Sequence, residues 1–115
     1  MEPKIIHPED CEEKDYGDTK VTDLINSEDW PFFSIAKVRK TGNNIKTGYD
    51  SESNVTYYVL EGEGIAVING KEFHIKKGDL VLYPKGTKYK HLKGLTLLAI
   101  ANPLFDRKKR VYKEG

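Results

Sequence analysis

The sequence predicts an all-β domain, an antiparallel sandwich or barrel made of short strands. Runs rich in β-branched and aromatic residues recur along the chain, with a turn signal about every 8–12 residues. The pair Asn69-Gly70 separates two of these runs, and both residues tolerate the positive φ that a tight type I′ hairpin needs. No long stretch has the periodicity of an amphipathic helix.

The predicted barrel occupies residues 31–104. Its clearest strand lies at residues 55–60, where the letters VTYYVL combine β-branched and aromatic side chains. Gly62 and Gly64 follow this run and predict a turn or bulge, because glycine permits a sharp change of direction. The other strands are expected at residues 32–39, 65–68, 71–75, 80–83, 88–92 and 95–101.

Charged segments flank the predicted barrel on both sides. Residues 1–30 are an acidic N-terminal arm with ten Asp and Glu against three Lys, and we expect a possible short strand at residues 4–6 and a strand or turn at 21–26. Residues 105–115 are a basic C-terminal tail. Because its basic run is interleaved with little besides Tyr112, we interpret this tail as solvated rather than as an anion-binding arm.

The composition limits the classes of protein and of site. A chain of 115 residues has room for one domain, and its seven Tyr and four Phe can supply a core although 32% of the residues are charged. The net charge of +1 gives no general attraction to nucleic acid or to a membrane. Three His and one Cys exclude a disulfide framework and a multi-cysteine metal cluster. With no signal peptide and no cysteine pair, we expect a cytoplasmic protein.

Two stretches of this sequence resemble the cupin superfamily, whose members are small jelly-roll barrels. The letters YYVLEGEG at residues 57–64 match the end of the first cupin motif, G-x5-H-x-H-x3–4-E-x6-G. Gly78, Pro84 and Gly86 match the spacing of the second motif, G-x5-P-x-G-x2-H-x3-N. The resemblance covers about residues 32–104. It implies a double-stranded β-helix (jelly-roll) cupin barrel in a single domain with an N-terminal arm.

The metal ligands of the family are missing from the matching positions. Metal-binding cupins hold a divalent ion with two His and one Glu of the first motif and the His of the second. Here the Glu position is Val55 and the second-motif His position is Tyr89. The two other positions depend on the spacing chosen, and they fall on Gly48 and Asp50 or on Tyr49 and Ser51. Because valine cannot coordinate a metal and hydroxyls are poor ligands for soft or borderline ions, we expect no metal and no other cofactor.

Strand alternation predicts what lines the barrel instead. The resemblance points position 89 inward, and residues two apart on a strand share a face, so Tyr89 and His91 should both face the interior. The same alternation puts Tyr57 on the inner face, with Tyr49 or Asp50 at the rim. We therefore expect these five residues to form the binding pocket of a small molecule.

Three functions stay open on the sequence alone. The first is a protein that binds a small polar metabolite or a sugar in the barrel without the usual metal. The second is a metal-independent isomerase or epimerase, in which His91 and Tyr89 are the catalytic acid–base pair. The third is a metal-dependent enzyme with non-standard ligands, such as His91, Asp50 and a tyrosinate. The cupin fold hosts many unrelated activities, so neither the ligand nor an enzymatic role follows from the fold.

The uneven charge also predicts an assembly. Residues 1–30 carry a net charge of −7, and residues 31–115 carry +8. Cupins commonly pair through sheet faces or N-terminal strands. An acidic arm that complements a basic body favours a homodimer at low ionic strength, where such charges are least screened.

Overall fold

The computed structural model describes residues 2–113 as ten β-strands and two short 3-10 helices. The strands are β1 (Glu13–Asp15), β2 (Thr19–Ile25), β3 (Ser34–Lys40), β4 (Thr47–Asp50), β5 (Asn54–Ile68), β6 (Lys71–Lys76), β7 (Leu80–Tyr83), β8 (Tyr89–His91), β9 (Leu95–Asn102) and β10 (Arg110–Lys113). The helices are η1 (Pro8–Asp10) and η2 (Arg107–Lys109). Among these residues, no helix is long and apolar enough to cross a membrane. The all-β prediction is confirmed.

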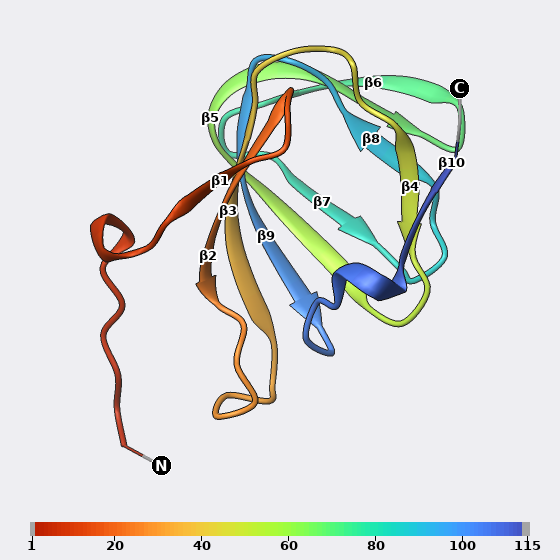
Figure 1. The fold of residues 1–115 in the computed structure, drawn as a ribbon. Helices are drawn as coiled ribbons and strands as arrows, with labels where there is room; N and C mark the ends of the chain where they lie inside the picture. The colour runs from red at the N-terminus through yellow and green to blue at the C-terminus, as the bar shows by residue number, and fades with distance from the viewer. Residues whose placement is uncertain (1, 114–115) are drawn as a thin grey trace.

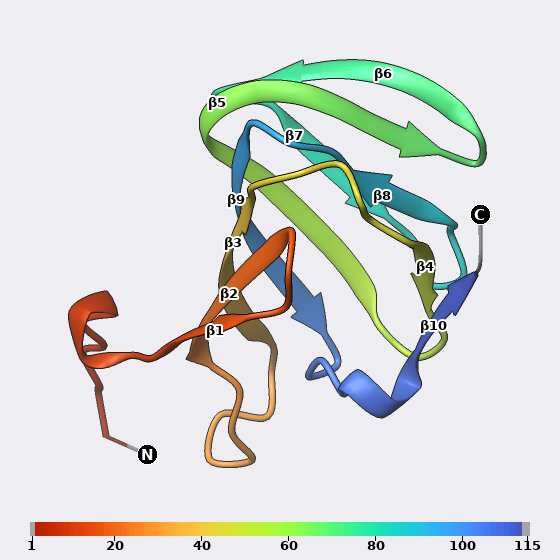
Figure 2. The same cartoon turned by 45° about the horizontal axis from the view of Figure 1, so that its top comes forward.

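Strand β5 belongs to both sheets of the barrel. Its first part, residues 54–62, pairs with β9 on one side and with β7 on the other. Its second part, residues 63–68, pairs with β6 and β8. The strand orders are therefore β1-β2-β3-β9-β5-β7 in the first sheet and β10-β4-β8-β5-β6 in the second. The two sheets curl around a common interior (Figures 1 and 2), which is the predicted double-stranded β-helix, or jelly roll.

The passage of β5 from one sheet to the other depends on two glycines. Gly62 and Gly94 both have positive φ, of 80° and 102°, a region that side chains disfavour. A Cβ at Gly62 would overlap the carbonyl oxygen of Gly94, so the two backbones touch there. Of the turn or bulge expected at Gly62 and Gly64, the turn is wrong, because the strand continues through both residues; a register shift typical of a bulge lies just before them, between Val59 and Glu61.

Side-chain size divides the interior into a filled end and an open end. The filled end is a core of buried apolar side chains: Val59, Ala66, Ile75, Leu95 and Leu97. Along β9 the inward positions change from leucine at 95 and 97 to alanine at 99 and 101. Ala36 of β3 stands opposite Ala99 in the sheet. Since these three inward methyl groups cannot fill the space that leucines fill, this end of the barrel stays hollow.

Several strands lie where the sequence predicts them, and others do not. Strand β7 has the predicted bounds, and the Asn69-Gly70 hairpin joins β5 to β6 with positive φ at both residues. By contrast, no strand forms at residues 4–6. The strand or turn expected at residues 21–26 is strand β2, which covers residues 19–25 and extends the first sheet beside β3 rather than belonging to a separate arm. Strand β4, which carries Gly48 and little β-propensity, is not among the strands that the sequence predicts.

The C-terminal segment is the largest departure from the sequence prediction. Instead of a solvated tail, it forms η2 and then β10, which pairs antiparallel with β4 and places Arg110 opposite Asp50 (Figure 2). Val111 and Tyr112 are residue types with high β-propensity, and the backbone of β4 offers an unpaired edge to the strand that contains them. The basic segment therefore closes one side of the barrel.

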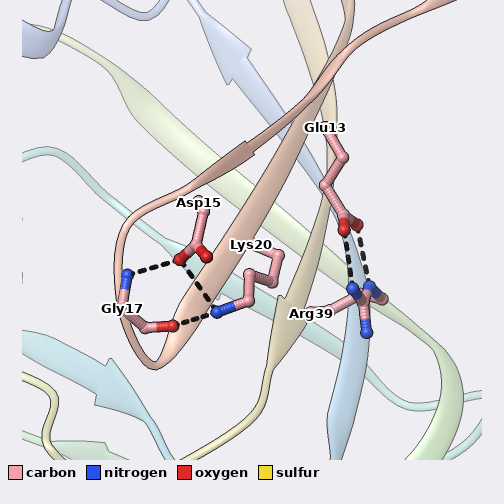
Figure 3. A network of polar contacts seen from close by, with 5 residues as sticks. All are labelled: Glu13, Asp15, Gly17, Lys20 and Arg39. Atoms are coloured by element: carbon pink, nitrogen blue, oxygen red, sulfur yellow. Dashed lines mark hydrogen bonds and ion pairs between the residues drawn. The ribbon is translucent and has the colours of Figure 1, made fainter.

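A polar network joins the N-terminal hairpin to the first sheet (Figure 3). Glu13 accepts two hydrogen bonds from Arg39, at 2.8 and 2.6 Å, and Asp15 accepts one from Lys20 at 2.9 Å. These pairs are exposed, so each contributes little to stability. Their structural effect is to hold the β1–β2 turn, which carries Tyr16, against the body of the barrel, while the segment before β1 leads away from it (Figure 1).

We predict that Gly62→Ala destabilises the protein more than Gly70→Ala. Both glycines have positive φ, near 80°, so each alanine should cost about 1–2 kcal/mol in backbone strain. Only the Cβ at position 62 meets a neighbouring backbone, which should add about 1–3 kcal/mol, whereas the Cβ at position 70 meets nothing. Urea unfolding of the two variants measures the difference, and equal losses would contradict the role given to the contact between Gly62 and Gly94.

Candidate functional site

The hollow end of the barrel contains a cavity of about 440 Å³. Its walls come from both sheets and from the C-terminal segment, and none of the core leucines reaches it. Most of its apolar lining consists of small inward side chains, namely Val21, Ala36, Val38, Val55, Ala99 and Ala101, and Ile45 and Phe105 complete it. A cavity of this size lies within the range of about 300–1,000 Å³ that is usual for small-molecule sites.

A chain of hydrogen bonds crosses the polar wall of this cavity. Arg110 Nη1 donates to Asp50 Oδ2 at 2.9 Å and to the Tyr89 hydroxyl at 3.1 Å. The Tyr89 hydroxyl is in turn 3.0 Å from that of Tyr57. The Asp50 side chain is 5% exposed and that of Arg110 is 11% exposed, so this ion pair is withdrawn from solvent. The network connects β10, β4, β8 and β5 at one place in the barrel.

An aromatic cluster holds these hydroxyl groups in position. The rings of Tyr83 and Tyr89 stack with centroids 3.9 Å apart and an interplanar angle of 5°. The rings of Tyr57 and His91 meet in a T-shaped arrangement with centroids 4.5 Å apart. The Tyr83 hydroxyl is 2.8 Å from His91 Nε2. Every fully buried side-chain nitrogen and oxygen among the described residues has a hydrogen-bond partner. The cluster is therefore a closed, rigid wall rather than a mobile surface.

Burial sets the protonation states of this wall. Burial, together with the nearby positive charges of Lys40 and Arg110, lowers the pKa of His91 to about 3, so its imidazole is neutral at neutral pH. Burial raises the pKa of the Tyr57 and Tyr89 hydroxyls, which therefore stay protonated. Burial also raises the pKa of Asp50, while Arg110 acts in the opposite direction and stabilises the carboxylate. At neutral pH the wall thus presents phenol groups and a guanidinium.

The structure brings together four of the five residues expected in the pocket. Asp50, Tyr57, Tyr89 and His91 all line the cavity. Tyr49 does not, which corrects the prediction for this residue: consecutive side chains of a strand point to opposite faces, so the inward direction of Asp50 turns Tyr49 outward. An acid–base role for His91 and Tyr89 stays a prediction, although an imidazole with a pKa of about 3 is a weak base.

Sequence reasoning missed three residues of the site. Tyr83 could have been found, since the predicted strand 80–83 and its alternation put this residue on the same face as Val81. Lys40 also follows the inward alternation of Val38, one residue beyond the strand predicted at 32–39. Arg110 carries no comparable pattern, because its position depends on the pairing of β10 with β4.

The residues at the family's metal positions do not fit a metal ion. Two of these positions hold Asp50 and Tyr89, and both are already bonded to Arg110 Nη1. A third holds Val55, which lines the cavity and has no donor atom. Among the described residues, no group of three His, Cys, Asp or Glu side chains is placed to hold a metal. The guanidinium group of Arg110 is therefore hydrogen-bonded to two residues, Asp50 and Tyr89, that occupy ligand positions of metal-binding cupins.

We predict that Arg110→Met destabilises the protein by about 3–5 kcal/mol, because it leaves the buried Asp50 carboxylate without its counter-charge. The double variant Asp50→Leu/Arg110→Met removes both charges and should recover most of this loss. Urea unfolding of the wild type and of the single and double variants measures the coupling. A double variant as unstable as Arg110→Met would contradict the interpretation as a buried ion pair.

We also predict an acid sensitivity that comes from His91. An unfolded imidazole with a pKa of 6.5 takes up a proton that the folded one, with a pKa of about 3, does not accept. The contribution of His91 to stability is therefore complete above pH 6.5 and is lost as the pH falls toward 3, by about 1.4 kcal/mol per pH unit at most. Urea unfolding between pH 3 and pH 7 gives the free energy of unfolding as a function of pH. In His91→Gln this free energy should no longer fall with pH on account of residue 91, whereas in Tyr83→Phe, which keeps the imidazole, the fall should remain. The same dependence on pH in the wild type and in His91→Gln would refute the assignment.

Comparison with known proteins agrees with this architecture. The cupin domain family matches residues 40–93. An uncharacterised protein of Aquifex aeolicus is 36% identical over 69 residues, which are 57% of this chain and 57% of that protein. An uncharacterised protein of Methanocaldococcus jannaschii is 40% identical over 42 residues, 36% of this chain and 32% of its own. Each match therefore covers less than two thirds of the relative's length.

Solved structures resemble nearly the whole chain. Streptomyces Pac13 with uridine superimposes with a TM-score of 0.87 at 17% identity, over 99% of this chain and 93% of Pac13. A protein from Planctomyces limnophilus superimposes with a TM-score of 0.88 at 18% identity, over 96% of both chains. Ectoine synthase from P. lautus superimposes with a TM-score of 0.80 at 16% identity, over 98% of this chain and 91% of the synthase. At these identities the likeness establishes the fold. The chain therefore has the jelly-roll fold of the cupins, and its residues 40–93 match the cupin domain family.

Proposed function

We propose that the protein binds a small polar organic molecule in the barrel cavity. The observation that carries this proposal is the cavity of about 440 Å³, in which an apolar wall of small side chains faces a wall of phenol groups and a guanidinium. Concave sites with an apolar lining and a few convergent polar groups are the usual form of small-molecule sites. The apolar wall would exclude water, and the polar wall would orient the ligand.

Each polar residue has a distinct role in this proposal. The hydroxyls of Tyr57 and Tyr89 can donate to or accept from a ligand hydroxyl or carbonyl group. Arg110 supplies further N–H donors, since only its Nη1 is used for Asp50 and Tyr89. The rings of Tyr57 and Tyr89 are fixed by their neighbours, so little side-chain freedom would be lost on binding.

The structural neighbours support the size of the ligand but not its identity. Pac13, described as a nucleoside dehydratase, shares this fold and has been solved with uridine, so a barrel of these dimensions admits a molecule as large as a nucleoside. The proposal for this chain stops at binding. Turnover by His91 is not part of it, because an imidazole that is neutral at neutral pH cannot serve as a general acid there.

We predict that filling the cavity abolishes binding. A thermal-shift screen of sugars, nucleosides, nucleotide sugars and small organic acids identifies a ligand, since a molecule that binds only the folded state raises the melting temperature. Ala99→Leu projects a larger side chain into the cavity, so this variant should stay folded and lose the shift.

The control for this experiment lies on the same strand. Ile100 is the next residue of β9 and does not line the cavity, so Ile100→Leu should keep the full shift. A ligand that stabilises Ala99→Leu as strongly as the wild type binds elsewhere on the protein, and this result would overturn the proposal.

A further inference from the structure

The charge around the cavity is strongly unbalanced. Four cationic side chains belong to its walls: Lys40, Lys46, Arg107 and Arg110. Lys90 also borders the cavity, but it lies between the inward-facing Tyr89 and His91 on β8, so its side chain points the other way. Two carboxylates line the cavity, Asp23 and Asp50, and His91 is neutral at neutral pH. These side chains therefore carry a net charge of +2, on a protein whose total net charge is +1. A concave site with one sign of charge concentrates ligands of the opposite sign.

Lys40 is a part-buried cation of the cavity wall. It is the last residue of β3, on the inward face of that strand with Ala36 and Val38. Its Nζ donates to the Thr19 hydroxyl at 3.0 Å, and among residues 2–113 it forms no ion pair with a carboxylate. Burial, with a further contribution from Arg110, lowers the pKa of Lys40 to about 8, so most molecules keep this positive charge at neutral pH. A part-buried charge of this kind is stabilised by an anion beside it.

Arg110 provides a second set of donors toward the same space. Its bonds to Asp50 and Tyr89 both come from Nη1, which leaves the Nε and Nη2 donors without a partner among the described side chains. The planar group of an arginine binds carboxylate and phosphate oxygens in pairs. Lys40 and Arg110 come from different sheets and line one cavity, so both face the space in which a ligand would lie.

We propose that the molecule bound in the cavity is an anion whose carboxylate or phosphate group lies between Lys40 and Arg110, while its neutral part contacts Tyr57 and Tyr89. This inference rests on the proposed binding function and names the class of its ligand. It assigns to Lys40 the selection of anions over neutral molecules, which the aromatic wall alone would not provide.

The test compares matched neutral and anionic probes by calorimetry and thermal shift. The pairs are D-glucose with D-glucuronate, glycerol with glycerate, and uridine with uridine 5′-monophosphate, each at millimolar concentration. At least one anionic probe should bind about tenfold or more tightly than its neutral partner. Lys40→Met should largely remove this preference, because it deletes one of the two cations that the proposal places beside the anionic group. Lys37→Met is the matched control, because Lys37 lies on β3 but faces away from the cavity, and this variant should keep the preference.

The pH dependence gives a readout that a purely structural role of Lys40 would not produce. The titratable and charged groups that share the cavity with Lys40 include Asp23, Asp50, Tyr57, Tyr89, His91, Arg110 and Tyr112. The amine binds an anion in its protonated form, so the affinity for a carboxylate probe should be constant below pH 8 and then fall by up to about tenfold per pH unit. Lys40→Arg keeps a charge that does not titrate in this range, so this variant should bind the anion with no decline.

Each outcome decides between the two proposals. If a neutral probe binds as tightly as its anionic partner and Ala99→Leu abolishes both, the binding function stands and the anion inference is overturned. If the preference survives in Lys40→Met, the residue assignment is overturned. If no anionic probe binds in a saturable way, the anion inference fails, and if no probe of either kind binds, the proposed function fails with it.

Discussion

The passage of β5 from one sheet to the other is the constraint on which the rest of the barrel depends. A strand that pairs with β9 and β7 over its first part and with β6 and β8 over its second must bend while it keeps its hydrogen bonds. Two glycine backbones touch at this bend, Gly62 against Gly94, where any side chain would separate them. Because the bend brings the sheets face to face, inward residues that are distant in the chain share one interior.

What fills this interior changes from one end to the other. Along β9 the step from Leu97 to Ala99 ends the packed core and begins the cavity, and Ala36 continues the same change on β3. Packing density therefore determines where the cavity begins. Regular strands and a rigid aromatic cluster position Asp50, Tyr57 and Tyr89, while residues 44–46 and Phe105, which lie outside the strands, complete the lining.

The charged groups of the site are distinctive within this fold. Where the family places His ligands, Asp50 and Tyr89 instead bind the guanidinium of Arg110. An arginine brings one permanent positive charge and directional N–H donors, but it offers no coordination site. Together with Lys40 it makes the cavity positive, and this charge is the basis of the proposal that the ligand is an anion.

The sequence determined those features that depend on local pattern. The Asn69-Gly70 hairpin, the bounds of β7 and the inward direction of Tyr57, Tyr89 and His91 all follow from turn chemistry and from the period of two along a strand. The prediction for Tyr49 is wrong because the family motif allows two spacings, and the sequence does not decide whether position 49 or position 50 faces the cavity. The alignment with the cupin motifs also shows, without a structure, that Val55 and Tyr89 replace two metal ligands of metal-binding cupins.

Only the tertiary structure decided where the charges meet. Arg110 lies 60 residues after Asp50, and nothing local to either residue indicates that β10 pairs with β4. Lys40 is the last residue of its strand, and the residues next to it in the sequence do not indicate that it is buried. Its pKa falls only because other strands bury it near Arg110. Pairing between distant strands and the desolvation that follows from it are properties of the closed barrel. The local sequence therefore determined which strands and inward faces form, while barrel closure determined the electrostatics of the cavity that they enclose.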